Sequence, residues 1–240
     1  MGTSAIAPYN GYDETVNAGI TNEFSTACYR VGHSMLSTQI PIGNGNGLPL
    51  REGFFRPDKV DQMGIEPFLR GLAQNTMQRI DTRIVDEVRN FLFRLASESG
   101  DQILDLAALN IQRGRDHGIP SYNACRVAVG LPAKASMAQI SADAAVQNAL
   151  QSTYGTPGNI DLWVGGLAEV PTVGAAVGEL IGKVLAEQFR RTRDGDWYWY
   201  ENDHDFNKKE REELAKTTLA DVIERNTGLT GLQKNVFFAA

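Results

Sequence analysis

The sequence predicts a mainly α fold with very little β structure, formed by a single domain over residues 1–240. Apolar residues make up 42% of the chain and are spread along its length, so the chain can fill a substantial core. In several segments they recur at three- and four-residue spacing, which indicates helices with one buried face. Only Trp197 to Tyr200 has a strand-like composition, and this segment is short. The sequence contains no internal repeat and no linker, which favours one body.

The first predicted helix runs from about Asn22 to Leu36. Thr21 or Asn22 can cap its N-terminus, and Glu23 lies favourably in its first turn. The segment from Pro41 to Pro49 is rich in glycine and asparagine, which predicts a break.

The clearest amphipathic pattern predicts a helix from about Thr82 to Ser97, closed by Gly100. Its buried face consists of Ile84, Val85, Val88, Phe91, Leu92 and Leu95. A short segment at Pro67–Ala73 precedes this helix. Further helical segments are predicted at Asp105–Gln112, Tyr122–Val129, Ala135–Tyr154 (as one or two helices), Ala176–Thr192 and Lys208–Arg225.

Composition excludes several classes of protein. The net charge of −6 and the pI near 5.2 argue against a nucleic-acid-binding surface. No apolar run is long enough for a membrane span, and the N-terminus lacks the pattern of a signal peptide. The two cysteines, Cys28 and Cys125, are interpreted as small buried side chains rather than a disulfide framework.

His33 is the first candidate functional residue. On a helical wheel it lies opposite the apolar face of its helix, with Thr26, Tyr29 and Arg30 as neighbours. This side carries no Lys or Glu after Glu23, so we expect a second buried or half-buried face that meets something other than a protein core. A planar cofactor with an iron centre would fit, because the imidazole could coordinate the iron and the arginine could pair with a carboxylate. A surface histidine, or a core histidine with satisfied hydrogen bonds, remains the alternative.

The segment Leu109–Pro120 (LNIQRGRDHGIP) is the second candidate. It combines an amide, two arginines, an acid and a histidine before two chain-turning residues. Such a set predicts a polar network that must be satisfied wherever it is buried.

Several blocks resemble the animal haem peroxidase family, the group that contains myeloperoxidase, lactoperoxidase and peroxidasin. LNIQRGRDHGIPSYNA is similar to the family's most recognisable stretch, and NEFSTACYRVGHSML is similar to its proximal-helix motif. GIEPFLRGL, YGTPGNIDLWVGGLAE, QFRRTRDGDWYWYEN and RNTGLTGLQKNVF resemble further blocks, and the resemblance covers about Tyr9 to Phe238. It implies a helical haem peroxidase domain.

The resemblance implies roles for four residues. His33 matches the axial ligand of the haem iron, and Asn110 matches the asparagine that accepts a hydrogen bond from that histidine's other ring nitrogen. Arg30 and Arg113 match arginines near the haem propionates. The chemistry agrees, since a ligating imidazole needs its second nitrogen fixed and a guanidinium suits a carboxylate.

Two further motifs are interpreted as structural. Arg115, Asp116 and His117 are expected to form an ion-pair and hydrogen-bond network. Asp203-His204-Asp205 imitates the family's peroxide-cleaving motif but follows the proximal helix instead of preceding it, so we expect a solvated loop.

The resemblance also implies what this chain does not contribute. The distal histidine and arginine, the calcium-binding loop and the acids that bond covalently to haem belong upstream of Tyr9, so we expect the domain to be incomplete at its N-terminus. No catalytic residue is identified on the distal side. Three interpretations remain: a fragment, a degenerate relative or a truncated peroxidase.

The implied function is reduction of hydrogen peroxide with oxidation of a halide, thiocyanate or phenolic donor. The cofactor would be haem, as iron protoporphyrin IX (b-type) or a covalently modified derivative. The partners would be haem, peroxide and donor, together with the missing N-terminal half or another chain. The location would be secreted or extracellular. A haem-binding or interaction module without peroxide chemistry is the alternative, and an inert fragment is a third.

Overall fold

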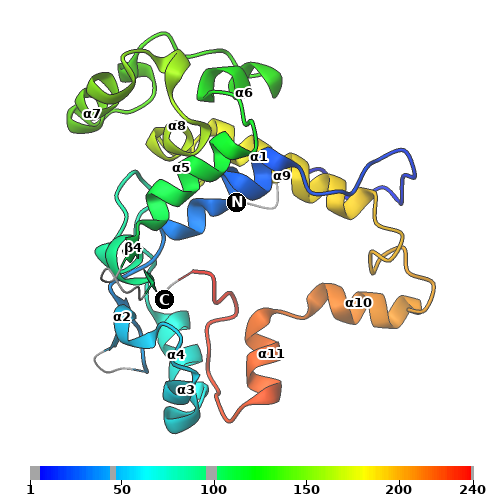
Figure 1. Ribbon diagram of the computed structural model, residues 1–240. Helices are drawn as coiled ribbons and strands as arrows, with labels where there is room; N and C mark the ends of the chain where they lie inside the picture. The colour runs from blue at the N-terminus through cyan, green and yellow to red at the C-terminus, as the bar shows by residue number, and fades with distance from the viewer. Residues whose placement is uncertain (1–5, 44–46, 96–101, 239–240) are drawn as a thin grey trace.

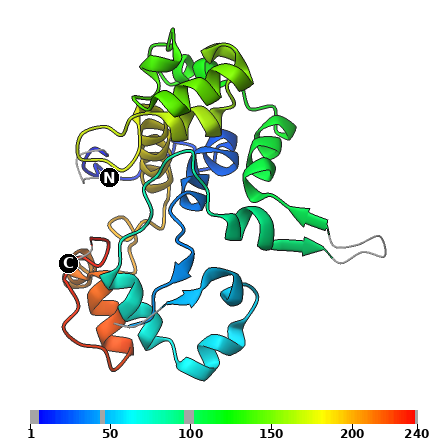
Figure 2. The ribbon, with the colours of Figure 1, turned by 90° about the vertical axis from the view of Figure 1, so that its left-hand side faces the viewer.

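The computed structural model describes residues 6–43, 47–95 and 102–238, and it is mainly α, as the sequence predicts (Figure 1). The described β structure consists of two short antiparallel pairs, β1 (Gln39–Ile40) with β2 (Leu48–Pro49), and β3 (Phe93–Leu95) with β4 (Gln102–Leu104). The second pair projects from the helical body (Figure 2). No described helix has the length and apolarity needed to cross a membrane.

The helices follow in chain order. The α-helices are α1 (Asn22–Thr26), α2 (Leu50–Gly53), α3 (Pro57–Met63), α4 (Glu66–Gln74), α5 (Leu106–Asp116), α6 (Tyr122–Ala128), α7 (Ala144–Tyr154), α8 (Leu162–Ala168), α9 (Glu179–Asp194), α10 (Lys208–Lys216) and α11 (Leu219–Asn226). The 3₁₀ turns are η2 (Cys28–His33), η4 (Met137–Gln139) and η5 (Pro157–Asn159), and η3 (Glu87–Phe91) is a single π turn.

The main hydrophobic core lies where η2, α6, α8 and α9 meet (Figure 1). Close approach of α6 and α8 requires Gly165, because any larger side chain there would collide with the ring of Tyr122. Trp163 and Leu180 fill this core, and both are buried. Cys28 and Cys125 also lie in it as free, buried thiols, which confirms their interpretation as small core residues.

The N-terminal segment runs along α9 and fixes the start of α1. The buried amide of Gln188 accepts a hydrogen bond from the Thr21 N–H at 2.9 Å and donates to the Gly19 carbonyl at 3.2 Å. The Asp13 N–H donates to the carbonyl of Asp194 at the end of α9. These long-range contacts place α1, and therefore η2, against α9.

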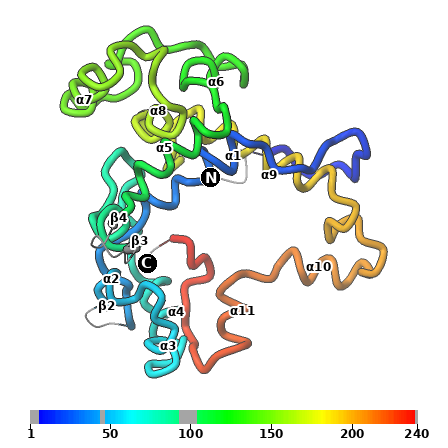
Figure 3. Tube along the Cα trace, in the orientation of Figure 1, coloured from blue at the N-terminus to red at the C-terminus, as the bar shows by residue number. Residues whose placement is uncertain are grey.

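The C-terminal helices form an arm that leaves the end of α9 and returns to α4 (Figures 1 and 3). Capping boxes start both helices, with Asn207 at α10 and Thr218 at α11. The arm closes on α4 because the Gly228 N–H donates to the Glu66 carboxylate at 2.6 Å. The predicted helix at Lys208–Arg225 is therefore two helices, since the Thr218 cap starts a new one.

The predicted helix at Asn22–Leu36 is shorter than expected. α1 ends at Thr26, whose hydroxyl donates to the Asn22 carbonyl at 2.6 Å, a contact that competes with helix propagation. Ala27 then leaves helical geometry, and the chain tightens into the 3₁₀ turn η2. The predicted apolar face was nevertheless correct: Phe24, Ala27, Cys28 and Val31 are buried and Met35 packs against them.

Two other sequence-based predictions were wrong. The segment Thr82–Ser97 was predicted to be one helix, but only η3 is helical and Phe93–Leu95 pairs as a strand with Gln102–Leu104. A short apolar run is compatible with a helix or a strand, and here pairing with Gln102–Leu104 selects the strand. Its predicted end at Ser97 and Gly100 lies outside the described residues, as does part of Pro41–Pro49. Trp197–Tyr200 is a turn, not a strand.

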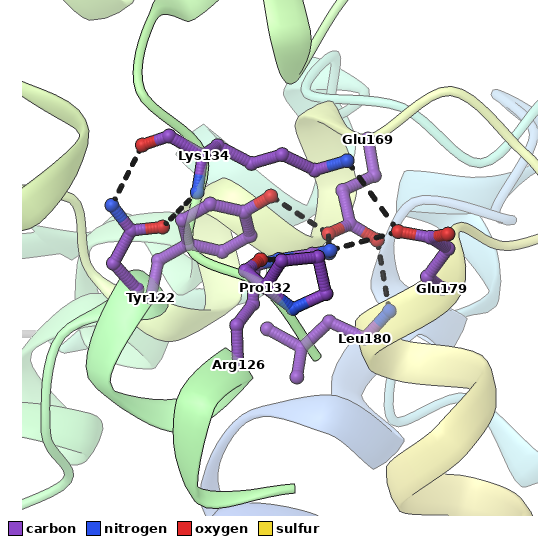
Figure 4. Close-up of polar contacts among 8 residues, drawn as sticks. Tyr122, Arg126, Pro132, Lys134, Glu169, Glu179 and Leu180 are labelled. Carbon is purple, nitrogen blue, oxygen red and sulfur yellow. Dashed lines mark hydrogen bonds and ion pairs between the residues drawn. The ribbon is translucent and has the colours of Figure 1, made fainter. Parts of the chain in front are cut away.

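A buried ion pair joins α6 to the segment between α8 and α9 (Figure 4). Arg126 is fully buried and pairs with the carboxylate of Glu169, which also accepts hydrogen bonds from the Tyr122 hydroxyl at 2.7 Å and the Leu180 N–H at 2.9 Å. A second contact links Arg126 to Glu179 at 2.8 Å. Burial and Glu169 together raise the pKa of Tyr122, so its hydroxyl stays protonated and donates.

We predict that Arg126→Met lowers the free energy of unfolding by about 3–5 kcal/mol, because Glu169 would remain buried without its counter-charge. Denaturant unfolding of the haem-free chain measures the change. Arg56→Met is the matched control, because the Arg56–Asp58 pair is exposed and contributes little to stability. Equal effects of the two substitutions would contradict the stabilising role of the buried pair.

Candidate functional site

The turn η2 places Arg30 and His33 on one side of the backbone. A 3₁₀ turn has about three residues per turn, so side chains three apart lie one above the other. Cys28 and Val31 occupy the other side and are buried in the core, while Arg30 and His33 are only partly buried. Packing of Cys28 and Val31 in the core therefore leaves His33 on the side of η2 that faces away from the core.

Helix α5 brings Asn110 to this pair from a distant part of the sequence. The carboxylate of Asp105 caps the helix by accepting from the Ala107 N–H at 2.8 Å. Asn110 is 1% exposed, with Nδ2 lying 2.8 Å from Nδ1 of His33. Nη1 of Arg30 donates to Oδ1 of the same amide at 2.8 Å. The structure thus joins three of the four predicted residues directly.

The contact with Arg30 decides how the amide faces the imidazole. A guanidinium has donors only, so it must face the amide oxygen, and the amide N–H then faces His33. In the neutral ring Nδ1 accepts this hydrogen bond, and Nε2 carries the proton. This differs from the sequence-based expectation, in which Asn110 accepts from the histidine.

The electrostatics of the site favour a neutral imidazole. Burial, followed by the charge of Arg30, lowers the pKa of His33 below its ordinary value. Burial, followed by the charge of Arg113, likewise lowers the pKa of Arg30. Arg113 itself is exposed, and neither guanidinium forms an ion pair within the described ranges. An anion placed between them would relieve their repulsion.

Trp163 is a contributor that sequence reasoning missed. It is buried in α8, and its indole N–H donates to the carbonyl of Arg30 at 3.4 Å. This contact anchors the backbone of η2 to α8. The sequence offered no signal for it, because the two residues are 133 positions apart and a buried tryptophan usually only fills a core.

The residues after Arg113 hold the end of α5. Arg115 forms a bidentate ion pair with Asp161: Nε donates to Oδ1 at 2.9 Å and Nη2 donates to Oδ2 at 2.7 Å. The Tyr154 hydroxyl donates to the same carboxylate. Asp116 accepts from Gln112 within the helix, and His117 is exposed at the helix end. These contacts fit the structural interpretation of the segment.

The sequence Asp203-His204-Asp205 lies in a turn between α9 and α10, as predicted. His204 is exposed, and its ring lies edge-on to Trp197 with 5.9 Å between centroids. The carbonyl of Asp203 accepts from Arg211 of α10. These local contacts explain the motif without a catalytic role.

A cavity of about 470 Å³ lies elsewhere, between the N-terminal segment, α6 and α9. None of the four predicted residues lines it. Arg190, one of its charged lining residues, is already paired with Glu187 and Asp194. The chemistry of the imidazole site, rather than the size of this cavity, therefore identifies the functional region.

A family model described as "Animal haem peroxidase" matches residues 2–237. The chain belongs to the animal haem peroxidase family. Animal haem peroxidases require haem, and the described residues fit that group. A neutral imidazole beside Arg30, with Arg113 as a second nearby cation, suits an iron centre with carboxylate substituents.

Named relatives of this animal haem peroxidase chain are peroxidases and a peroxinectin. It is 40% identical to peroxinectin A of Dictyostelium discoideum over 95% of this chain and 43% of that protein. It is 38% identical to human thyroid peroxidase over 97% of this chain and 26% of that protein. The chain therefore spans less than half the length of these relatives.

Solved structures share the fold of this animal haem peroxidase chain. Peroxidase A from Dictyostelium discoideum superimposes with a TM-score of 0.86 at 39% identity, over 96% of this chain and 45% of that one. Fatty acid alpha-dioxygenase from Oryza sativa gives a TM-score of 0.74 at 22% identity, over 88% and 38% respectively. The second likeness shows the fold alone.

We predict that the stability contributed by Asp161 is lost at low pH. Burial opposes ionisation, but hydrogen bonds from Arg115 and Tyr154 outweigh it and hold the pKa of Asp161 below its usual value. A folded-state pKa below the unfolded-state pKa of about 3.9 adds stability at pH values above about 3.9. This stability is lost as the pH falls through the folded-state pKa. The difference in free energy of unfolding between wild type and Asp161→Asn should therefore shrink below about pH 4. A difference that is constant from pH 7 to pH 3 would contradict this.

Proposed function

We propose that this chain forms the proximal half of the haem site of a peroxidase, with His33 as the axial ligand of the haem iron. The observation that carries the proposal is the 2.8 Å contact between His33 Nδ1 and the buried amide of Asn110. A ligating histidine needs its second ring nitrogen held, because that contact sets the orientation and basicity of the ring. Asn110 is the residue proposed to hold it.

Arg30 and Arg113 are proposed to bind the carboxylates of haem. Arg30 lies beside His33, and the charge of Arg113 acts on Arg30. Neither cation has an ionised partner in the described part of the chain, and a guanidinium can bind a carboxylate with two parallel hydrogen bonds. We propose iron protoporphyrin IX (b-type), or a covalently modified derivative, as the cofactor. We place the family's calcium site outside this chain.

Bound haem would supply the redox chemistry that reduces hydrogen peroxide and oxidises a halide, thiocyanate or phenolic donor. The residues of this chain bind the cofactor, orient it and keep one of its faces covered. Peroxide cleavage also needs a positioned base and an electrostatic stabiliser, and each is worth orders of magnitude in rate. No distal residue is assigned in this chain, so we propose that the N-terminal half of the domain or another chain supplies them.

In this proposal residues 1–240 form one part of a single peroxidase domain. The proposed partners are haem, hydrogen peroxide and a small electron donor rather than nucleic acid. A secreted or extracellular location rests on the family resemblance alone. The alternative, a haem-binding or interaction module without peroxide chemistry, is favoured by the exposed position of Asp203-His204-Asp205, the one histidine motif of distal type in the sequence.

We predict that haemin added to the chain gives the visible spectrum of histidine-ligated iron and that His33→Ala abolishes it, because the axial nitrogen is lost. Titration followed by absorbance measures both. His117→Ala is the matched control, since His117 is exposed and outside the proposed site. Identical spectra for wild type and His33→Ala would refute the ligand assignment.

Turnover of a phenolic dye separates the enzyme from the binding module. If this chain alone lacks a positioned base, its haem-loaded form should oxidise the dye no more than about tenfold faster than free haemin, well below a complete site. Steady-state absorbance measures the rate. A rate hundreds of times that of haemin would show that the chain carries distal chemistry of its own.

A further inference from the structure

Arg30 and His33 contact opposite ends of one amide group. Nη1 of Arg30 donates to Oδ1 of Asn110, and Nδ2 of Asn110 faces Nδ1 of His33, each at 2.8 Å. If the amide turned over, Nδ2 would face the guanidinium, donor against donor. While Arg30 stays in place, it therefore fixes which end of Asn110 meets the imidazole.

This arrangement leaves the wrong nitrogen protonated for binding a metal. With Nδ2 donating to Nδ1, the proton of the neutral ring is on Nε2. A metal needs a free lone pair on the ligating nitrogen. His33 can offer Nε2 only after Asn110 has turned its oxygen toward Nδ1, and that requires Arg30 to leave the oxygen.

Arg30 is held loosely enough to leave. The other described hydrogen bond of its side chain runs from Nε to the Ser25 carbonyl at 3.2 Å, and the side chain is partly exposed. Both partners are neutral oxygens, and burial, followed by the nearby charge of Arg113, lowers the pKa of Arg30. A carboxylate would bind the guanidinium more strongly than either oxygen, because charge-assisted hydrogen bonds are roughly twice as strong as neutral ones.

We propose that Arg30 is a positioning residue that couples capture of a carboxylate to the tautomer of His33. When Arg30 turns to the carboxylate, Asn110 rotates and its Oδ1 accepts a hydrogen bond from Nδ1–H of His33. One proton leaves Nε2 to water and another is taken up at Nδ1, so the ring stays neutral. Nε2 then presents its lone pair.

This proposal rests on the proposed function only in naming haem as the owner of the carboxylate. The part played by Arg30 and Asn110 is a property of the haem-free chain and can be tested there. The chain has three histidines, His33, His117 and His204, so each ring can be assigned by substitution in a ¹⁵N-histidine-labelled sample. The nitrogen chemical shifts report which nitrogen carries the proton.

In the haem-free wild type, His33 should be mainly the Nε2–H tautomer. Arg30→Met should shift the tautomer ratio about tenfold or more toward Nδ1–H, because loss of the charge-assisted hydrogen bond frees the amide. Arg113→Met removes a neighbouring charge but no contact with Asn110, so it should leave the ratio unchanged. A mainly Nδ1–H wild type, or equal shifts in the two variants, would overturn the proposal.

Asn110→Asp provides a second variant, in which the same shift toward Nδ1–H is expected although Arg30 stays in place. A carboxylate can accept from Arg30 and from Nδ1–H of His33 at the same time, so Nδ1 should carry a proton without any added ligand. A His33 ring that kept Nδ1 unprotonated in this variant would show that Asn110 does not control the tautomer.

The coupling to an anion is tested with haemin and its dimethyl ester, which lacks free carboxylates. Wild type should bind haemin about tenfold or more tightly than the ester, and Arg30→Met should lose most of that preference. Equal affinities in wild type would overturn the coupling. Failure of haemin to bind at His33, with the tautomers as expected, would refute the proposed function and leave the roles of Arg30 and Asn110 standing.

Discussion

The side-chain amide of Asn110 is the interaction on which the candidate site depends. It is almost completely buried, and a buried amide must find hydrogen-bond partners. Its partners are Arg30 and His33, which lie 80 and 77 residues away in the sequence. Because the amide has a donor end and an acceptor end, its orientation determines the tautomer of His33. The same contact therefore joins η2 to α5 and sets the chemical state of the imidazole.

The rest of the fold keeps this contact in place. Trp163 holds the carbonyl of Arg30 from α8, and Gly165 lets α8 pack closely on Tyr122 of α6. The buried pair of Arg126 and Glu169 then ties α6 to the segment leading into α9. The core side of η2 is consequently held in place, while the side that carries Arg30 and His33 is only partly buried.

The arrangement is consistent with the proposed proximal half of a haem site. The imidazole and the two guanidiniums suit a haem bound on one face, and the chain spans less than half the length of its named relatives. The histidine of Asp203-His204-Asp205, a motif of the type found on the distal face of haem in the family, contacts Trp197 in an exposed turn. In the proposed function this chain holds and orients the cofactor, and the groups that cleave peroxide come from elsewhere.

Some features could be predicted from local sequence because their causes are local. The apolar stripe of Phe24, Ala27, Cys28 and Val31 predicted the buried face of the first helix even though the helix shortens to α1 and η2. Ordered blocks such as LNIQRGRDHGIPSYNA sufficed for the family and for the mainly α fold. The strand at Phe93–Leu95 could not be predicted, because its conformation depends on pairing with Gln102–Leu104.

The sequence by itself determined the family, the helical architecture and the residues that compose the candidate site, since each of these is written in residue type and spacing. Only the tertiary structure decided how those residues meet. It placed Trp163 on the carbonyl of Arg30 and set Arg30 on the oxygen of Asn110. The orientation of that amide, and with it the tautomer of His33, depends on which donors lie within hydrogen-bond distance, and that is known only when η2 and α5 are packed together.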